Sequence, residues 1–485
     1  MKKRLSAIIC LCLALVMILC VAGCGGKQKK AIDTGAEDFD IEGILNEVDD
    51  NADDASDATG SDAAKKGGKV TAAAIPGADS LSWNQLVSQM PKELKGTTIT
   101  VDDWNASKEY TGSEKVMREF EKQTGIKIKW VVTPYDNYTT KVAALINAKN
   151  SPDIIRMYTN DPFRMYLCDD VESATGFDFK GDIWDQRVSK AYTIKGKTYA
   201  VHYNNTLFQQ PKMFMYRRST IENLKMEDPY AVWKSGKWTW DKFIEMCKNY
   251  LQKNPNGNAW ISYNGVDYMS FSGRQLIEFD GTKYVNHQDD QEVVKALQTM
   301  CNLSAQGILS RAMRDQKVYQ QGNVLFMTFN SIALRRTNSN LMEAKSEDEL
   351  YCVPIPTIPG RENVQEYSEL EASGIPKGAK NPAAAYYYLR YFYDADNYNP
   401  DEVFINKQAY DVYKACRSKS QVFCNYDSYI LVSSTGSEDS SAYYGISSYA
   451  PHGGSVAQLK PELDKIKPNI DLATKKANEL LAKFK

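Results

Sequence analysis

Histidine is scarce in this chain: only His202, His287 and His452 occur in 485 residues, and they lie far apart. A metal site or catalytic triad built on histidine is therefore not expected. The cysteines form no CxxC pair and no spacing typical of zinc sites. The segment WNASKEYTG, after the first predicted strand, lacks the GxGxxG and GxxxxGKS/T phosphate-loop patterns. We predict neither a cofactor nor a metal.

An excess of either charge is also missing. The formal net charge is -2, from 59 basic and 61 acidic residues. No basic face with interleaved aromatic residues stands out, which argues against a nucleic-acid partner. Long apolar runs are limited to one near the N-terminus, so no membrane span is expected after residue 24.

That single run belongs to a pattern typical of bacterial lipoproteins. Basic residues at 2–4 precede the apolar stretch 5–19, and the small residues Val-Ala-Gly lead directly to Cys24. This layout predicts a secretory signal over 1–23, with Cys24 as the lipidated first residue of the mature protein. The other interpretation is a transmembrane anchor, for which the stretch is slightly short because spanning takes about 20 residues.

Residues 24–90 are predicted to form a disordered acidic tether. Asp, Ala, Gly and Ser dominate this segment, and few residues are large and apolar. Such a composition cannot bury enough surface to offset the entropy of ordering. Repulsion among the acidic residues would keep the segment extended.

From residue 91 to 485 the composition is globular, and this length favours two lobes over one hydrophobic core. The first part alternates between strand and helix patterns. Predicted strands lie at 97–104, 126–133 and 152–158, with predicted helices at 113–125 and 135–150 between them. This order is typical of a parallel sheet with crossover helices.

In open sheets of this kind, ligands bind beyond the carboxyl ends of the strands. The residues at those positions mix aromatic and hydrogen-bonding side chains: Trp104 and Asn105 after the first strand, and Tyr158, Asn160 and Asp161 after the third. Aromatic rings can stack on the apolar faces of a sugar, while the polar groups take its hydroxyls. Packing of Trp104 against its own lobe is the competing interpretation.

Five further segments carry a resemblance to a known family. They are YAVHYNNTLF, GKWTWDKFIEMCKNY, YQQGNVLFMTFNS, VPIPTIPG and SGIPKGAKNPAAAYYYLRYFYD. In this order, and after the strand–helix opening, they resemble the family 1 extracellular solute-binding proteins, which serve ATP-driven importers and include maltose- and oligosaccharide-binding proteins. The third segment departs from the family pattern, with Tyr319 in place of Phe. Without the family, Thr239 can cap the helix that begins at Trp240.

The resemblance implies an α/β fold with two periplasmic-binding-protein-like lobes of the class II type, each a sheet flanked by helices and joined by hinge crossovers. Lobe 1 would hold about 92–204 and 350–395, and lobe 2 about 205–349 and 396–485. The lobes would close on a carbohydrate, which the protein would deliver to the permease subunits of an ABC transporter. It would be a monomer that catalyses no reaction.

The resemblance also directs attention to the second lobe and the crossovers. Tyr263, Tyr268 and Arg274 lie in a polar, aromatic-rich segment, and Asn330 ends a predicted strand. Glu369 and Glu371 are candidates at the edge of the cleft, with a solvated loop as the competing interpretation. A tryptophan that stacks on sugar in some family members is absent, and Ala333 stands there. We expect Trp238, Trp240 and the tyrosines of residues 381–394 to be core residues instead.

Several alternatives remain open at this point. A surface-anchored glycoside hydrolase would need a pair of carboxylates, and carboxylates are plentiful. The same fold could instead bind a peptide, or ferric ion through Tyr443 and Tyr444. It could also report to a sensor kinase. Cys416 and Cys424 are close enough in sequence for a disulfide, but buried thiols fit equally well. The predicted location is the extracellular face of a Gram-positive-type cell membrane.

Overall fold

The computed structural model describes residues 75–135, 138–157, 162–262, 274, 276–310, 323–337, 350–358, 367–369, 371–419, 421–422, 449–450 and 453–484. All of these residues belong to one compact unit within Asp40–Lys485. Among them, no helix combines the length and apolarity needed to cross a bilayer. The predicted signal, Cys24 and the tether up to residue 74 lie outside the described residues.

One sheet, here called the first sheet, has the strand order β13-β3-β1-β2. Its strands are β1 (Thr98–Asp103), β2 (Lys127–Val132), β3 (Ile154–Met157) and β13 (Ala372–Gly374). β1 pairs in parallel with β2 and β3, whereas β13 runs antiparallel to β3. Helices α5 (Ser113–Thr124) and α6 (Tyr138–Asn147) connect the parallel strands. The predicted alternation of strands and helices over 97–158 is confirmed.

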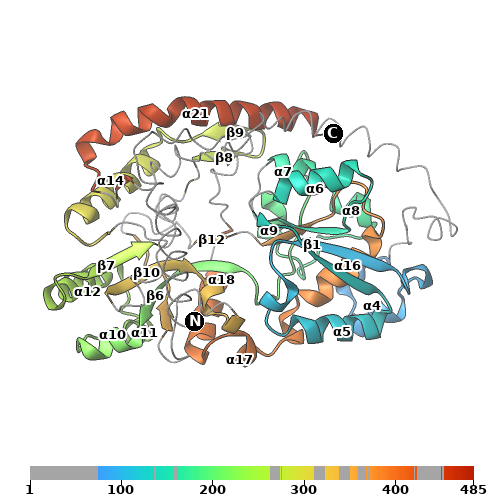
Figure 1. Cartoon of the computed structure of the whole chain (residues 1–485), viewed down its shortest axis with the longest axis horizontal. Coiled ribbons are helices and arrows are strands. Elements are labelled where there is room, and N and C mark those ends of the chain that lie inside the picture. Colours follow the sequence, from blue (N-terminus) through green and yellow to red (C-terminus); the bar gives the residue numbers. More distant parts are fainter. Residues whose placement is uncertain are drawn as a thin grey trace, which may run out of the picture. The chain divides into compact units, whose positions relative to one another are not determined.

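Local sequence explains α5. Its residues Val116 and Phe120 recur at helical spacing and are buried, and Gly125 ends the helix with φ of 74°, a left-handed conformation that suits glycine. Figure 1 shows α4 and α5 on one side of the first sheet and α6 and α7 on the other. Helix α8 contacts α16 and shares a core cluster with α4 and α5. This arrangement covers both faces of the sheet, as parallel strands require.

The second sheet has the order β14-β12-β6-β10-β7, and β11 also pairs with β6. Its bounds are β6 (Gln210–Arg217), β7 (Asn258–Ser262), β10 (Val324–Asn330), β11 (Leu350–Val353), β12 (Tyr367–Glu369) and β14 (Gln421–Val422). All residues of β6 and β10 are buried. β6 runs antiparallel to β10, β11 and β12, so it is the central strand of this sheet.

The remaining helices, hairpins and 3-10 helices surround or connect the two sheets. The helices are α4 (Trp83–Ser88), α7 (Pro162–Tyr166), α8 (Val171–Thr175), α9 (Gln186–Ala191), α10 (Arg218–Asn223), α11 (Pro229–Lys234), α12 (Trp240–Lys253), α14 (Gln291–Ala305), α16 (Pro382–Phe392), α17 (Pro400–Val403), α18 (Lys407–Lys419) and α21 (Val456–Lys483). Short hairpins pair β4 (Thr193–Ile194) with β5 (Lys197–Thr198) and β8 (Ile277–Phe279) with β9 (Tyr284–Asn286). Short 3-10 helices include η1 (Ala78–Ser80) and η5 (Ser331–Leu334).

Residues 75–90 differ from the sequence expectation, which assigned them to the tether. Ser82 and Gln85 form a capping box at the start of α4, and Leu86 of this helix is buried. The ring of Trp83 lies 4.6 Å from that of Tyr391. Asp79 accepts hydrogen bonds from Trp184 Nε1 at 2.9 Å and Tyr386 OH at 2.6 Å. The folded part therefore begins by residue 75, because a few anchoring side chains outweigh the polar average composition.

The boundary between the sheets also differs from the predicted one near residue 350. β11 pairs with β6, so residues 350–353 belong to the second sheet. The chain returns to the first sheet only at β13, directly after β12. The opposite passage, from the first sheet to the second, runs through the segment before β6, where Val201 bridges to Ser373. We call two stretches the crossing segments: residues 201–210, and the described residues 369 and 371–372 from the end of β12 to the start of β13.

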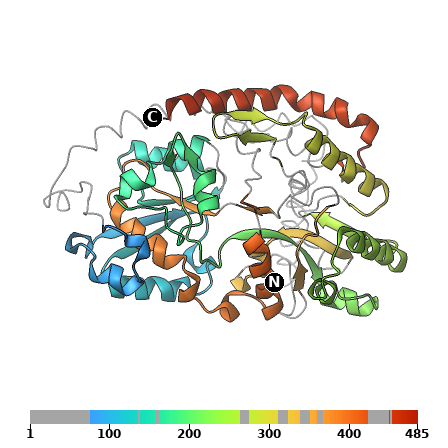
Figure 2. The same ribbon diagram turned by 180° about the vertical axis from the view of Figure 1, so that it is seen from behind.

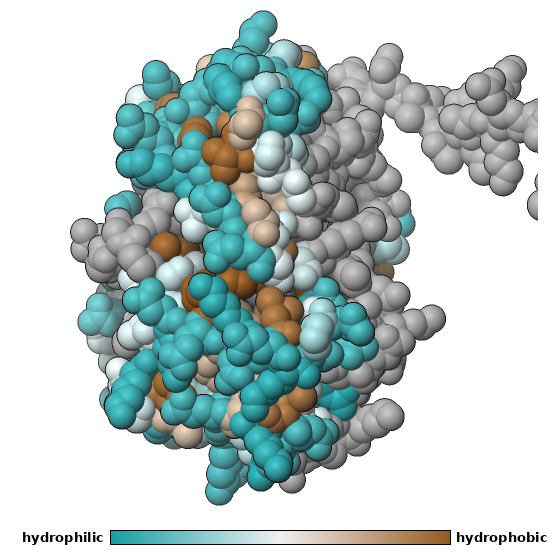
Figure 3. Space-filling model, turned by 90° about the vertical axis from the view of Figure 1, so that its left-hand side faces the viewer, coloured by the Kyte–Doolittle hydropathy of each residue, from teal (hydrophilic) through white to brown (hydrophobic). Residues whose placement is uncertain are grey.

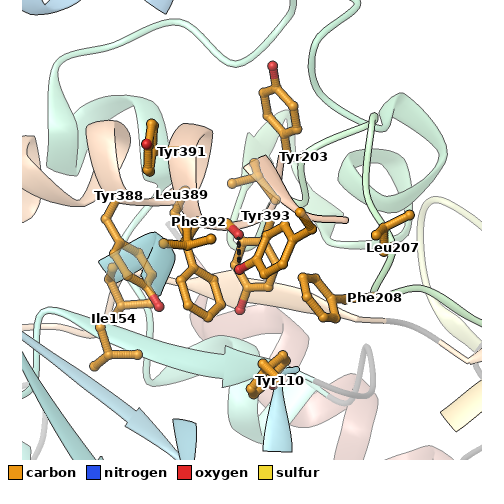
Figure 4. Close-up of a cluster of buried hydrophobic side chains, with 14 of the residues drawn as sticks. Tyr110, Ile154, Tyr203, Leu207, Phe208, Tyr388, Leu389, Tyr391, Phe392 and Tyr393 are labelled. Atoms are coloured by element: carbon orange, nitrogen blue, oxygen red, sulfur yellow. Dashed lines mark hydrogen bonds between the residues drawn. The ribbon is translucent and has the colours of Figure 1, made fainter. Parts of the chain in front are cut away.

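A cluster of aromatic side chains forms much of the core beside the first sheet. Every residue of α16 is buried, including Tyr386, Tyr387 and Tyr388, so the prediction that these tyrosines are core residues is confirmed. Figure 4 shows Phe392 and Tyr393 next to Phe208, with Tyr110 close to them. The Tyr110 ring lies 5.2 Å from Phe208 and 5.7 Å from Phe392, edge-on in both cases.

The second sheet has its own aromatic core. Trp240 is buried and packs against Phe243 and Trp260, at centroid distances of 5.2 and 6.3 Å. Trp238 is partly buried against the same cluster and donates to Pro354 O at 2.7 Å. The expectation that both tryptophans pack in the core is confirmed.

Helix α21 is the longest of the described helices and contacts α14, β9 and α7. Figure 2, from behind, again shows it running along α14 and the β8–β9 hairpin. Asn478 fixes it to β9 by accepting from Tyr284 N at 2.8 Å and donating to Tyr284 O at 2.9 Å. Beyond its last turn, Phe484 lies between Tyr166 and Tyr199, at 5.3 and 5.1 Å.

Figure 3 shows the face that carries α10, α12 and α14. Its coloured part is mostly hydrophilic, with hydrophobic residues in small separate groups. Groups of this size are normal on a protein surface and need no partner to explain them.

Candidate ligand-binding site

The candidate site begins where β1 ends. Asp102 and Asp103, the last residues of the strand, are buried, and Trp104 follows them as a half-buried residue. This is the carboxyl end of a parallel strand, where ligands bind in open α/β sheets. The sequence prediction selected Trp104 and Asn105 for this reason.

The indole of Trp104 is held by its neighbours. The rings of Tyr135 and Tyr138 lie 5.3 and 5.1 Å from it, both edge-on. The guanidinium carbon of Arg156 lies 4.3 Å from the ring centre, and that of Arg164 lies 5.8 Å away. Cation–π contact with two arginines gives the indole a defined orientation. A half-buried, oriented indole is suited to stacking against a flat or ring-shaped ligand.

Arg156 is the centre of a buried group of charges, which we call the Arg156 cluster. Its Nη1 donates to Asp103 Oδ1 at 3.1 Å, and its Nη2 forms an ion pair with Glu371. Gln210 also donates to Glu371 through its side-chain amide. The second oxygen of Asp103 accepts from Tyr110 OH at 2.8 Å.

Strand register explains why these residues meet. Arg156 in β3 lies opposite Ser373 in β13, so Glu371, two residues earlier, falls on the same side at a diagonal position. On the other side of β3, Asp102 pairs with Ile155, which brings Asp103 beside Arg156. The two carboxylates therefore flank one guanidinium across three strands.

Burial shifts the pKa values of this cluster. It raises the pKa of Glu371, although the charges of Arg156 and Arg335 oppose the change. Burial would lower the pKa of Arg156, but Asp103 and Glu371 outweigh it and hold that pKa well above its ordinary value. Arg156 is thus charged at any physiological pH, and its charge is matched by neighbouring carboxylates as a buried ion requires.

Two predicted site residues have structural roles beside or near this cluster. The backbone N of Asn105 donates to Asp103 Oδ1 at 2.7 Å, and its carbonyl accepts from Trp130 Nε1 at 2.9 Å. Asn330 is buried at the end of β10, where its side-chain oxygen caps η5 by accepting from Ile332 N at 3.2 Å. Their predicted ligand contacts remain predictions.

Arg274 lies in a different group, beside the β8–β9 hairpin. Its guanidinium pairs with Glu278 at 3.7 Å and with Asp290 at 3.5 Å. His287 Nδ1 is 2.8 Å from the same Asp290 carboxylate. This group is held together by its own opposite charges, and the predicted role of Arg274 in ligand binding remains a prediction.

The other predicted site residues lie outside the described residues: Tyr158, Asn160, Asp161, Tyr263 and Tyr268. The same holds for Tyr443, Tyr444 and Cys424. Glu369 is described only through its backbone, which pairs with Gln210 in β6. In the described part of the chain, no group of three or more His, Cys, Asp or Glu residues could hold a metal ion.

The sequence reasoning missed Arg156, Gln210 and the pair Tyr135 and Tyr138. One signal was available for Arg156, which stands in the otherwise apolar strand segment IIRM. A charge in a buried strand requires a partner of opposite sign nearby. The consecutive acids Asp102 and Asp103 at the end of another buried strand were the candidates for that partner.

Comparison with solved structures agrees with the two-lobed arrangement of sheets. The sugar-binding protein MalE from the phytopathogen Xanthomonas citri matches with a TM-score of 0.60 at 13% identity, over 80% of this chain and 100% of that one. The GacH receptor of Streptomyces glaucescens matches with a TM-score of 0.55 at 14% identity, over 80% and 100%. The fold is therefore the mixed α/β fold of two-domain periplasmic binding proteins.

Sequence comparison then identifies the family. Residues 115–400, more than half of the chain, match the family described as bacterial extracellular solute-binding protein. The chain belongs to this family. It is also 24% identical over 248 residues to the diacetylchitobiose binding protein DasA of Streptomyces coelicolor, a match that covers 47% of this chain and 52% of that protein. The match thus spans about half the length of this curated relative.

Proposed function

We propose that this protein captures a carbohydrate, with an oligosaccharide as the expected size, and passes it to the permease of an ABC transporter. The observation that carries the proposal is the oriented, half-buried indole of Trp104 at the carboxyl end of β1. A pyranose ring presents an apolar face that stacks on such an indole, and its hydroxyls require polar groups beside it. Family membership and the similarity to DasA support this ligand class.

The proposal is tested by thermal unfolding of the full-length chain with separate additions of diacetylchitobiose, maltotetraose and D-mannitol. A peptide mixture and ferric ion are added in parallel samples as probes that are not carbohydrates. A ligand at one hundred times its Kd stabilises the folded state by about 2.7 kcal/mol, so a true ligand raises the melting temperature in proportion to the logarithm of its concentration. A shift with peptides or ferric ion, but with no glycan, would overturn the carbohydrate assignment. Release of hydrolysis products in the same samples would favour a glycoside hydrolase.

Trp104→Ala locates the site. Removal of the indole deletes the stacking surface, so affinity for the glycan found above is expected to fall at least tenfold. Trp83→Ala is the matched control, because Trp83 is also half-buried but packs against Phe120 and Tyr391 on the α5 side of the first sheet. Equal affinities for the two variants would show that the ligand binds elsewhere.

We propose further that the mature protein is anchored to the outer face of the cell membrane through lipid on Cys24, with the acidic segment after it as a tether. The lipobox pattern in residues 21–24 supports this anchor. Metabolic labelling with a fatty acid is expected to mark the wild-type chain and not Cys24→Ser. A labelled Cys24→Ser chain would contradict this assignment.

A further inference from the structure

Arg156 contacts both the indole of Trp104, which we call the Trp104 platform, and one of the two crossing segments. Its guanidinium lies 4.3 Å from the ring centre of Trp104. The same group pairs with Asp103 in β1 and with Glu371 in a crossing segment. Arg156 is 4% exposed and Glu371 is 3% exposed, so solvent does not screen this pair appreciably.

Glu371 occupies a special place in the chain. It lies between β12 of the second sheet and β13 of the first, so any rearrangement of the two sheets passes through its backbone. Its carboxylate also accepts a hydrogen bond from Gln210, the first residue of β6 and the end of the other crossing segment. Gln209 Nε2 donates to the Glu371 carbonyl at 3.4 Å. One glutamate therefore holds both crossing segments.

The turn after β10 is fixed to the same region. Ser331 Oγ donates to Gln209 O at 3.0 Å, and Arg335 Nη2 donates to Phe208 O at 2.9 Å. The Arg335 guanidinium also covers the ring of Phe208 at 5.1 Å. Side chains of the turn after β10 and the Arg156 cluster therefore both hold the crossing segment 201–210 in place.

Building on the carbohydrate-binding function proposed above, we propose that Arg156 is a positioning residue that couples the Trp104 platform to the crossing segments. A ligand that stacks on Trp104 restrains the indole, and through it the plane of the Arg156 guanidinium. Because this planar fork must also meet Asp103 and Glu371, its orientation determines how well Glu371 is paired. An unpaired buried carboxylate is costly, so ligand binding selects one arrangement of the crossing segments.

The first test needs no ligand. Hydrogen–deuterium exchange of the full-length chain compares wild type with Trp104→Ala, Trp104→Phe and the control Trp83→Ala. Backbone amides of residues 207–210, 212 and 371–374 are expected to exchange at least tenfold faster in Trp104→Ala than in wild type. Trp104→Phe keeps a ring face for Arg156 and is expected to restore slow exchange. The same rates in Trp104→Ala and Trp83→Ala would overturn the coupling.

The second test is a double-mutant cycle with diacetylchitobiose as the probe. Trp104→Ala and Arg156→Lys are each expected to weaken binding at least tenfold, because lysine keeps the charge but loses the planar fork. The double variant is expected to bind no more weakly than the weaker single variant, which is the signature of coupled residues. If the affinity of the double variant falls by the product of the two single-variant factors, the proposal is overturned.

The two tests separate this proposal from the function on which it depends. If diacetylchitobiose does not bind the wild-type chain, the carbohydrate assignment fails for this probe, and the exchange comparison alone decides the coupling. If Arg156→Lys does not fold, the exchange comparison still applies, because its variants leave Arg156 in place.

Discussion

Asp102 shows how a single residue at the candidate site responds to burial. It is 1% exposed, and its Oδ2 accepts from Thr133 Oγ1 at 3.1 Å. Burial raises the pKa of Asp102 from 3.8 to about 6; the Thr133 hydrogen bond opposes this rise, and repulsion by Asp103 adds to it. The folded protein therefore retains a proton that the unfolded chain has already released.

This difference predicts a pH dependence of stability. Between pH 4 and 6 the folded state binds more protons at Asp102 than the unfolded state, so this residue makes the free energy of unfolding fall as pH rises. Asp102→Asn removes the effect, so its free energy of unfolding is expected to rise by about 2 kcal/mol relative to that of wild type between pH 4 and pH 6. Urea unfolding at pH 4, 5, 6 and 7 measures the difference. If the difference in free energy of unfolding between the two proteins does not change with pH, the shifted pKa of Asp102 is contradicted.

Arg156 shows a limit of residue-by-residue reasoning. The sequence predicted Trp104 from its place after a strand, but its partner Arg156 stands 52 positions later and Glu371 lies 215 positions beyond that. Glu371 was a candidate at the edge of the cleft, but nothing in the sequence joined it to Arg156 before the strands pair. Their functional interest comes from contact with one another, which no local spacing encodes.

Single elements were the most predictable level of the structure. Helix α12 follows its local sequence: Thr239 caps it by accepting from Lys242 N at 3.2 Å, and Asp241 lies in its first turn near the positive end of the helix. The predicted helix over 113–125 and the predicted strands around it are confirmed for the same reason. Periodicity and capping act within a few residues, so both can be recognised from the sequence alone.

The cap of α12 can be tested directly. Thr239→Ala leaves the amide of Lys242 without its acceptor and is expected to lower the free energy of unfolding by about 1 kcal/mol. Thr239→Ser keeps the hydroxyl and is expected to retain most of the stability. Urea unfolding of both variants gives the comparison, and equal losses would mean that the Thr239 methyl group, not its hydroxyl, stabilises the helix.

At the scale of the whole described unit, α21 links distant parts of the chain. Asn478 and Asp471 bind β9, through Tyr284 and Asn286 respectively. Just past the C-terminal end of the helix, Phe484 packs between Tyr166 and Tyr199, and Lys195 Nζ donates to the Phe484 carbonyl at 2.6 Å. The helix thus joins the β8–β9 hairpin to α7 and to Tyr199, which directly follows β5.

Because Phe484 makes this link, its replacement is predicted to have a measurable effect on stability. Phe484→Ala removes the aromatic contact with Tyr166 and Tyr199 and is expected to lower the free energy of unfolding by about 2 kcal/mol. Amide exchange in the last turns of α21 is expected to become faster. Leu472→Ala is the control on the same helix, since Leu472 is 44% exposed. Similar effects of the two variants would show that Phe484 does not anchor the helix.

The sequence alone determined the strand–helix order of the first sheet, the family resemblance and the choice of Trp104. These depend on periodicity, capping and motif order, which act over short separations along the chain. Only the tertiary structure decided that residues 75–90 pack on the core, that β11 joins the second sheet, and that Arg156 meets Glu371. The physical reason is that burial and charge pairing depend on which segments become neighbours in space, and strand register sets that across hundreds of residues.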